Sequence, residues 1–377
     1  MLVLNGPPQP LLPMLRLRLF LGLLFLAGGC QPPGQPAIAS AYGARTAPGL
    51  PDVVRPILDS SGTGIAMRPW SLRGYELTLH STQAELFAAD PSVVAVVGHP
   101  GSRDALLGAA VYNREGVPQV VPTGTSRALG RAGPWTFTLA PDDSVEGAFL
   151  ANWAIDSTGA RRIAVMYLGD EYGIGILEGV RGGLATRGMQ LVDQVLLPSQ
   201  SCGGTAAVNR EVYSAIGRAL IQRERPDVII LASANANGWC VTDLIHGTDP
   251  SIWILAADGF DVRQRSAGTR GVYAPDRLRG VSFWRRRNDD EASLEFVHRY
   301  SSATGRLPTA GDAMEYDAYM LLRAAILDVG PDREAIRAWL ESLGRRRPAW
   351  PGVTGPVSFD RPRSGILRMV APLDPAE

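Results

Sequence analysis

The sequence contains no lysine and has few cysteines and histidines. All 37 of its basic residues are arginines, and they balance 37 acidic residues, so the formal net charge at pH 7 is zero. A neutral chain has no general electrostatic attraction for nucleic acid or for an anionic surface. The three cysteines and four scattered histidines show no metal-ligand spacing, so we expect neither a bound metal nor another cofactor.

Catalytic signatures are absent as well. The sequence has no G-x-S-x-G, no H-E-x-x-H and no P-loop motif. The glycines of "YGIG" at 172–175 lack the spacing of a dinucleotide-binding turn, and the adjacent Asp170 and Glu171 are interpreted as the edge of a solvated loop. With 45% hydrophobic and 20% charged residues over 377 positions, the chain is globular and long enough for two domains. We therefore expect a two-domain protein that is not an enzyme.

One apolar run stands out, near the N-terminus. The segment "MLRLRLFLGLLFLAGGC" (14–30) places Arg16 and Arg18 before the apolar residues 19–26, and small residues follow. The apolar run is too short to cross a bilayer, which takes about 20 residues in a helix. Basic residues, a short apolar run and small residues in this order predict an export signal.

The end of this segment resembles the lipobox of bacterial lipoproteins, because small residues directly precede Cys30. The resemblance implies that Cys30 is lipidated and becomes the mature N-terminus, with Met14 as the expected true start. We predict a signal peptide over 1–29 and the lipidated cysteine with a proline-rich tether over 30–36. The protein is then extracytoplasmic, periplasmic or at the cell surface, and anchored to the membrane by lipid. A secreted protein with an incidental cysteine is the alternative.

Two further cysteines, Cys202 and Cys240, lie near the ends of expected strands. An exported chain folds in an oxidising compartment, where two remaining cysteines can pair. A disulfide between them is one interpretation, and two separate buried thiols are the other.

Short apolar runs alternate with amphipathic stretches from residue 75 onward. The expected strands lie at 93–98, 118–121, 162–168, 189–197, 227–233 and 251–256. The expected helices lie at 102–116, with Ser102 as N-cap, and at 143–159, 173–188, 209–226, 290–305 and 311–330. Residues 355–360 and 365–370 are expected to pair as a hairpin. The alternation predicts an α/β fold with mostly parallel sheets covered by helices.

Polar residues follow several of these strands. In parallel sheets ligands bind beyond the carboxyl ends of the strands, and helix N-termini there favour anions. Ser102 follows one strand, and Thr123 and Thr125 flank a glycine after the next, so their donors can hold a carboxylate. Asp258 follows a later strand and can hold an ammonium. Turn formation and helix capping, which use the same residue types, are the alternative.

The order of these segments resembles the leucine/isoleucine/valine-binding type of periplasmic solute-binding protein, the type I fold. The resemblance covers roughly residues 52–360. It is carried by "VVAVVGHPGSRDALLGAAVYNREGVPQVVPTGTS", "FTLAPDDSVEG", "VMYLGDEYGIG", "AADGF", "GRLPTAGDAMEYDAYMLLRAAI" and "GVTGPVSFD". It implies two α/β lobes joined by three hinge crossings, with the solute bound between them. Lobe 1 is expected to comprise 37–138 with 284–345, and lobe 2 to comprise 139–283 with 353–377.

The resemblance also assigns roles to the polar loop residues. Ser102, Thr123 and Thr125 match positions that hold the α-carboxylate and α-amine in amino-acid-binding members. Asp258 matches the acidic residue that pairs with the ammonium, and Tyr172 matches an aromatic residue that lines the cleft from lobe 2. A zwitterion would thus bridge the two lobes, which supplies the differential affinity that ligand-driven closure requires.

One region departs from the family pattern. The segment "PAIASAYGARTAPGLPDVV" (36–54) is short where the family has its first strand, so this strand is either degenerate or missing. The resemblance implies a lipid-anchored receptor that delivers an amino-acid-like or amide solute to an ABC permease. The alternative is a solute-independent lipoprotein of the same fold that regulates a cell-wall enzyme or another partner protein.

Overall fold

The computed structural model describes residues 35–42, 50–60, 64–68, 80–198, 202, 207–233, 235–263, 274–286, 289–360 and 367–371. The expected signal peptide, Cys30 and most of the tether lie outside the described residues. Within the described part of the chain, no helix combines the length and the apolar character needed to span a membrane.

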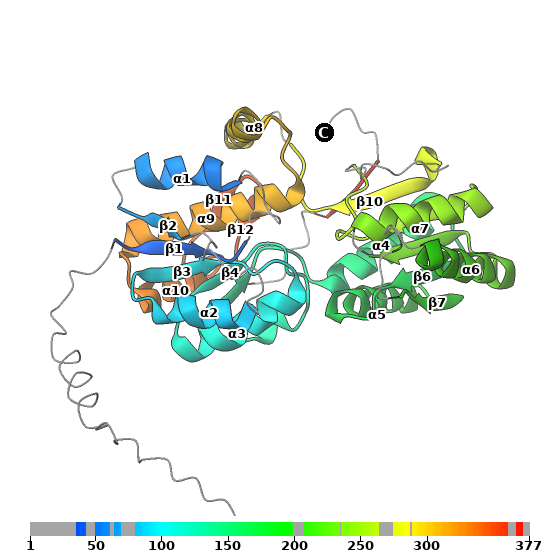
Figure 1. Ribbon diagram of the computed structural model, residues 1–377, viewed down its shortest axis with the longest axis horizontal. Helices are drawn as coiled ribbons and strands as arrows, with labels where there is room; N and C mark the ends of the chain where they lie inside the picture. Colours follow the sequence, from blue (N-terminus) through cyan, green and yellow to red (C-terminus); the bar gives the residue numbers. More distant parts are fainter. Residues whose placement is uncertain are drawn as a thin grey trace, which may run out of the picture.

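Lobe 1 is built on a parallel five-stranded sheet with the order β2-β1-β3-β4-β5. Its strands are β1 (Ala37–Ser40), β2 (Ala66–Arg68), β3 (Val93–Val97), β4 (Gln119–Val121) and β5 (Thr136–Thr138). The helices of this lobe are α1 (Leu50–Ser60), α2 (His80–Ala89), α3 (Ser102–Glu115), α8 (Glu291–Thr304), α9 (Ala310–Val329) and α10 (Arg333–Ser342). Figure 1 shows α9 and α10 lying against the same sheet as β1 and β3, although they come from the far end of the chain.

The first strand is present. β1 lies between β2 and β3, pairs with both in parallel, and all four of its residues are buried. Its apolar residues are Ala37, Ile38 and Ala39. A run this short is hard to distinguish from a loop by its sequence pattern alone. The doubt about a missing first strand is therefore resolved by its neighbours, because two flanking strands satisfy its backbone and cover its side chains.

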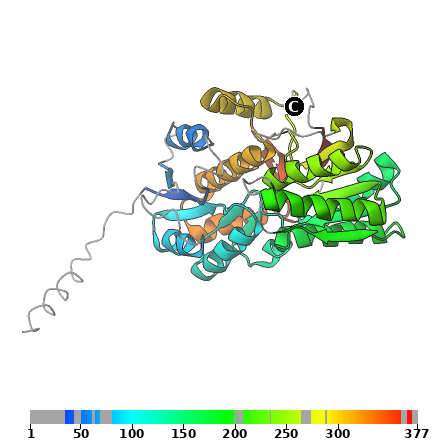
Figure 2. The same cartoon turned by 45° about the vertical axis from the view of Figure 1, so that its right-hand side comes forward.

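Lobe 2 is built on a six-stranded sheet with the order β13-β10-β9-β8-β6-β7. Its strands are β6 (Ile163–Tyr167), β7 (Asp193–Leu196), β8 (Val228–Ala232), β9 (Trp253–Ala256), β10 (Leu278–Ser282) and β13 (Arg368–Val370). Its helices are α4 (Asp143–Thr158), α5 (Glu171–Ala185), α6 (Ala207–Glu224) and α7 (Asn235–Thr248). All pairs are parallel except β10 with β13. Figures 1 and 2 show this lobe beside lobe 1, with the chain passing between them near their shared face.

Helices α4 and α5 approach each other closely because glycines form much of their contact. A Cβ on Gly147 would lie 2.5 Å from the carbonyl oxygen of Ile176, and one on Gly179 would lie 2.6 Å from that of Asp143. Only residues without a side chain allow this separation. The close packing brings the first turns of both helices together at the edge of lobe 2 that faces lobe 1.

Two expectations about the C-terminal region are wrong. The segments at 355–360 and 365–370 do not pair with each other. β12 (Gly355–Val357) pairs with β11 (Trp350–Gly352), whereas β13 adds to the edge of β10 in lobe 2. The expected hairpin is thus replaced by a local hairpin that starts earlier in the chain and by a long-range pairing of β13 with β10, which hydropathy patterns do not encode.

The hairpin of β11 and β12 packs on α9 in lobe 1. The Asp317 carboxylate of α9 accepts hydrogen bonds from the backbone N–H groups of Val353 (2.8 Å) and Thr354 (2.9 Å). Residues 353–357 therefore lie with lobe 1, whereas we expected them in lobe 2. The third crossing follows this hairpin, because β13 is already part of the lobe 2 sheet.

Cys202 and Cys240 are bonded in the structure. Their Cα atoms are 5.9 Å apart, and their sequence separation is 38 residues. Cys240 belongs to α7, and both residues are buried in the core of lobe 2. The bond links the segment after β7 to this helix.

Candidate functional site

The carboxyl ends of the strands of both lobes face each other. α3 of lobe 1 and α5 of lobe 2 come within 8 Å of each other, measured between Cα atoms. These helices follow β3 and β6, so their N-terminal turns and the adjacent loops form the facing surfaces. The five predicted ligand residues lie in these loops and first turns.

Ser102 connects two loops of lobe 1. It is the first residue of α3, and Gly101 precedes it with φ 70°, so Gly101 rather than Ser102 occupies the N-cap position we predicted for the serine. The Ser102 Oγ atom accepts the backbone N–H groups of Thr125 (3.3 Å) and Ser126 (3.1 Å). With its acceptor side occupied, the hydroxyl proton of Ser102 remains available to a ligand.

Thr123 is paired with a residue that sequence reasoning missed. Its Oγ1 atom lies 3.1 Å from the hydroxyl oxygen of Tyr42, which follows β1. Burial raises the pKa of the Tyr42 hydroxyl, and the nearby Glu315 raises it further, so Tyr42 stays protonated and can donate to Thr123. Thr123 was selected because it follows the carboxyl end of a strand. Tyr42 likewise follows β1, but selecting it requires β1 to be recognised as a strand.

Glu315 extends this polar group into α9. The side chain is 2% exposed, and its Oε1 atom has no hydrogen-bond partner. Burial raises the pKa of Glu315 well above its usual value, and the charge of Asp312 adds to the effect. The buried Tyr319 lies close enough for Glu315 to raise its pKa too. Lobe 1 therefore places a buried carboxyl group with a raised pKa near the Tyr42–Thr123 pair.

Tyr172 and Asp258 meet in lobe 2. Tyr172 is in the first turn of α5, which Asp170 caps by accepting the N–H of Gly173 (2.9 Å). The Tyr172 hydroxyl oxygen accepts the N–H of Gly259 (2.9 Å), the residue after Asp258. Burial and the charges of Asp258 and Glu146 raise the pKa of Tyr172, so its hydroxyl keeps its proton.

Asp258 lies against a second carboxyl group, that of Glu146 on α4. The backbone N–H of Asp258 donates to Glu146 Oε1 (2.7 Å), and Glu146 is fully buried. Burial raises the pKa of Asp258 to about 6, while interactions with Tyr172 and Glu146 lower it. Burial, together with the Asp258 charge, raises the pKa of Glu146 well above its usual value. Of these two carboxyl groups, Asp258 is therefore the readier to ionise.

A third carboxyl group, that of Asp143, links this pair to lobe 1. Asp143 is fully buried at the start of α4, and its backbone N–H donates to the carbonyl oxygen of Thr125 (2.8 Å). Burial raises the pKa of Asp143 to about 8; the Thr125 hydroxyl opposes this shift, and the Asp258 charge adds to it. We call Asp143, Glu146 and Asp258 the acidic cluster.

The structure therefore brings four of the predicted residues into one continuous set of contacts. Ser102 bonds the Thr125 loop, Thr125 contacts Asp143, and the acidic cluster leads to Asp258 and Tyr172. Thr123 belongs to the same loop as Thr125 but is directed to Tyr42. Sequence reasoning missed Tyr42, Glu315, Asp143 and Glu146. "PDDSVEG" (141–147) was interpreted as a hinge and helix start, and Asp142 does cap α4, which concealed the role of its neighbours.

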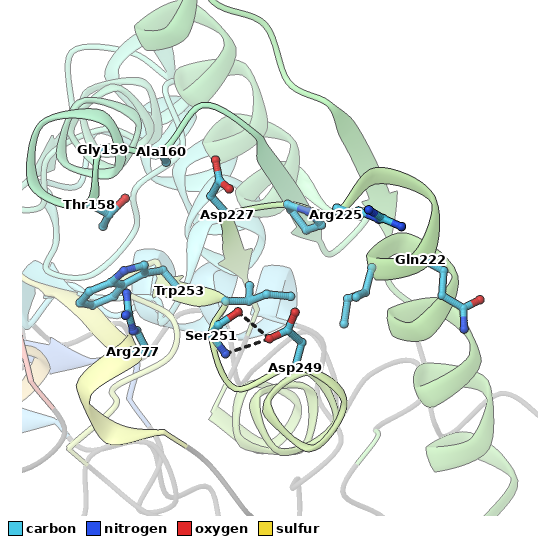
Figure 3. Close-up of a pocket in the computed structure, with 13 residues that line it drawn as sticks. Thr158, Gly159, Ala160, Gln222, Arg225, Asp227, Asp249, Ser251, Trp253 and Arg277 are labelled. Carbon is cyan, nitrogen blue, oxygen red and sulfur yellow. Dashed lines mark hydrogen bonds between the residues drawn. The ribbon is translucent and has the colours of Figure 1, made fainter.

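Two hollows in the molecule are lined by neither Tyr172 nor Asp258. One hollow, about 690 Å³, lies at the opposite edge of lobe 2, and its lining includes Asp227, Asp249 and Trp253 (Figure 3). Both of its carboxylates already accept hydrogen bonds from nearby backbone N–H groups. A second hollow, about 430 Å³, touches the loop of Thr125 from the hinge side. In the described part of the chain, no three Asp, Glu, His or Cys side chains are arranged to hold a metal ion.

Two α/β lobes with three crossings and polar loops facing each other define a bilobed ligand-binding protein. A family model described as periplasmic binding protein matches residues 78–369, and the chain belongs to this family. No curated protein sequence matches the chain. The description of this family is that of a binding protein.

Solved structures show the same fold. One is an ABC transporter substrate-binding protein from Desulfitobacterium hafniense in complex with leucine (20% identity, 90% of this chain and 97% of that chain, TM-score 0.71). Another is the leucine binding protein LivK from Thermotoga maritima (21% identity, 88% and 93%, TM-score 0.70). A third is an ABC transporter solute binding protein from Rhodopseudomonas palustris in complex with 3,4-dihydroxybenzoic acid (14% identity, 89% and 91%, TM-score 0.68). The type I α/β fold is thereby confirmed.

Proposed function

We propose that this protein is an extracytoplasmic, lipid-anchored receptor that binds an amino-acid-like solute between its lobes and delivers it to an ABC permease. The observation that carries the proposal is the connection from Ser102 through Thr125 and the acidic cluster to Tyr172. Donors lie on the lobe 1 side of this connection, and a charged carboxylate lies on the lobe 2 side.

The charges on the two sides suit a zwitterion. The hydroxyls of Ser102 and Thr123 can donate to a carboxylate, and the start of α3 adds the positive end of a helix dipole. Asp258 can accept from an ammonium, and a hydrogen bond to a charged group is about twice as strong as a neutral one. A solute held this way contacts both lobes, so its binding favours the closed arrangement.

Lipid anchoring and delivery to a permease are supported by different evidence. The anchor is inferred from the resemblance of the segment before Cys30 to a lipobox. Delivery to a permease follows from the family and from structural neighbours that are named as ABC transporter proteins. The leucine and dihydroxybenzoic acid complexes of those neighbours indicate that a solute with a carboxylate is a reasonable first choice.

The test uses the soluble chain starting at Gln31, in a thermal-shift screen followed by calorimetry against amino acids, small amides, ureas and carboxylates. A ligand at a hundred times its Kd adds about 2.7 kcal/mol of stability, which the screen detects. We expect an amine-bearing solute to bind and its affinity to fall at least about tenfold in Asp258→Asn, because an ion-paired hydrogen bond is lost. The control is Asp156→Asn, an exposed carboxylate on α4 that pairs with Arg187. Absence of any ligand across the panel contradicts the proposal and favours a solute-independent role.

A further inference from the structure

The acidic cluster holds more carboxyl groups than one ammonium requires. Asp143 and Glu146 are fully buried, and of their side-chain oxygens only Glu146 Oε1 has a hydrogen bond of ordinary geometry; the Thr125 hydroxyl lies near Asp143, and the Asp258 carboxyl group lies near Glu146. None of the ion pairs between described residues involves Asp143, Glu146 or Asp258. The group thus contains three acids and no base.

Such a group is costly to bury without a counter-charge. An isolated buried carboxylate is strongly disfavoured, and a buried neutral carboxyl group still needs an acceptor for its proton. Native proteins leave few buried polar groups unpaired, and each one calls for an explanation. None of the described basic side chains forms an ion pair with Asp143, so a bound cation can supply a partner for its carboxyl group.

Asp143 lies close to two parts of the proposed solute-binding site. Its backbone bonds the loop that carries Thr125, and its carboxyl group lies over Gly175, where a Cβ would collide with it. Asp143 is also close enough to Asp258 for the two charges to repel. The Asp143 carboxyl group therefore belongs to the same acidic cluster as Asp258, the carboxylate proposed to bind the ammonium.

Two kinds of cation can satisfy such a group. A metal ion needs its ligands to converge on one point, and the described acidic side chains show no arrangement of this kind. A flexible organic cation with several N–H donors can instead reach carboxyl groups that lie along the cleft.

We propose that the solute is a cationic amino acid, whose α-ammonium binds Asp258 and whose side-chain ammonium or guanidinium binds Asp143 and Glu146. This inference rests on the proposed function and specifies its substrate class. It excludes leucine-like solutes as the preferred ligands, because an aliphatic side chain leaves the buried carboxyl groups without partners.

The test compares ligands that differ only in the second cation. Lysine is matched with norleucine and arginine with citrulline, and each is titrated into the soluble chain by calorimetry. We expect at least one cationic member to bind about tenfold or more tightly than its neutral counterpart. In Asp143→Asn the ratio between the two members falls towards one, while the affinity for the neutral member is retained.

The control variant is Asp243→Asn, which changes another buried carboxyl group of lobe 2, on α7. It should leave both affinities and their ratio unchanged. If Asp143→Asn fails to fold, the matched ligands titrated into the unmodified chain still show whether a cationic side chain is preferred, since they require no variant.

The outcomes separate this inference from the proposed function. Preference for lysine or arginine supports both. Equal or tighter binding of norleucine, citrulline or another neutral amino acid overturns the cationic side-chain site and leaves the solute receptor intact. Failure of every amino acid to bind overturns both.

Discussion

Asp258 differs from the other acids of the site in being charged at neutral pH. Its pKa is raised to about 6, whereas that of Asp143 is raised to about 8 and that of Glu146 lies well above its usual value. Burial causes all three shifts, and the repulsion between neighbouring carboxylates increases those of Asp143 and Glu146. Asp258 is thus the readiest of the three groups to be charged at neutral pH, and the other two favour their protonated forms more strongly.

Affinity for an amine-bearing solute should depend on pH through Asp258. The carboxylate is charged above its pKa of about 6 and neutral below it, while an aliphatic ammonium stays charged throughout this range. We expect the affinity to fall as pH decreases through 6, by up to about tenfold for each further pH unit. The groups that face Asp258, namely Glu146, Asp143 and Tyr172, all have raised pKa values, so each favours its protonated form.

Calorimetry between pH 5 and pH 8 measures this dependence. Asp258→Asn should show a weak and nearly constant affinity below pH 7, because the titrating group is gone. A constant affinity in the unmodified chain from pH 5 to pH 7 would show that Asp258 does not hold the charge of the solute.

At the scale of elements, the contact of α4 with α5 determines where the acidic cluster lies. Asp143 and Glu146 come from α4 and Tyr172 from α5, and the interhelical glycines set the distance between these helices. An added methyl group must either push the helices apart or distort one of them.

Gly147→Ala should destabilise the protein, because its Cβ would meet the Ile176 oxygen at 2.5 Å and the Val180 nitrogen at 2.6 Å. We expect a loss of about 1–3 kcal/mol, measured by urea denaturation. Gly182→Ala on α5 is the matched control, since nothing lies within 4 Å of its added Cβ. That change should be neutral or stabilise by up to about 1 kcal/mol, since alanine favours a helix. Equal effects of both changes would contradict the importance of the glycine contact.

Much of this element structure could be predicted. The helices at 102–115 and 143–158 match the expected ranges closely, because amphipathic runs end at Gly116 and Gly159, which adopt the left-handed conformation with φ 67° and 74°. Helix α7 was not expected, and β1 was left open as either degenerate or missing. β1 has four small or apolar residues whose character depends on two flanking strands, and its pattern alone is too short to be distinctive.

At the scale of the molecule, the two lobes are joined by three crossings and come together at their strand ends. Hinged lobes of this kind move as rigid bodies, and a ligand that touches both shifts the population towards the closed form. The contacts from Thr125 to Asp143 lie at the first crossing and can persist in both forms. Those between the faces of α3 and α5 depend on closure.

Ligand binding should therefore make the molecule more compact. We expect the radius of gyration, measured by small-angle X-ray scattering, to decrease when the tightest ligand of the screen is added at saturation. In Asp258→Asn the same ligand concentration should leave the radius near its unliganded value, because the lobe 2 contact of the solute is lost. A radius that does not change in the unmodified chain at saturation would show that binding does not close the lobes.

Sequence alone determined the alternation of strands and helices, the family resemblance and the loops in which Ser102, Thr123, Thr125, Tyr172 and Asp258 lie. These features are local, since periodicity, glycine stops and polar loop residues depend on neighbours within a few positions. The tertiary structure decided which acids meet. Glu146 and Asp258 are 112 positions apart, and a lack of basic partners becomes visible only when all surrounding elements are in place. Burial then makes that lack costly, because a carboxyl group removed from water needs a partner, and none of the described basic residues pairs with this cluster.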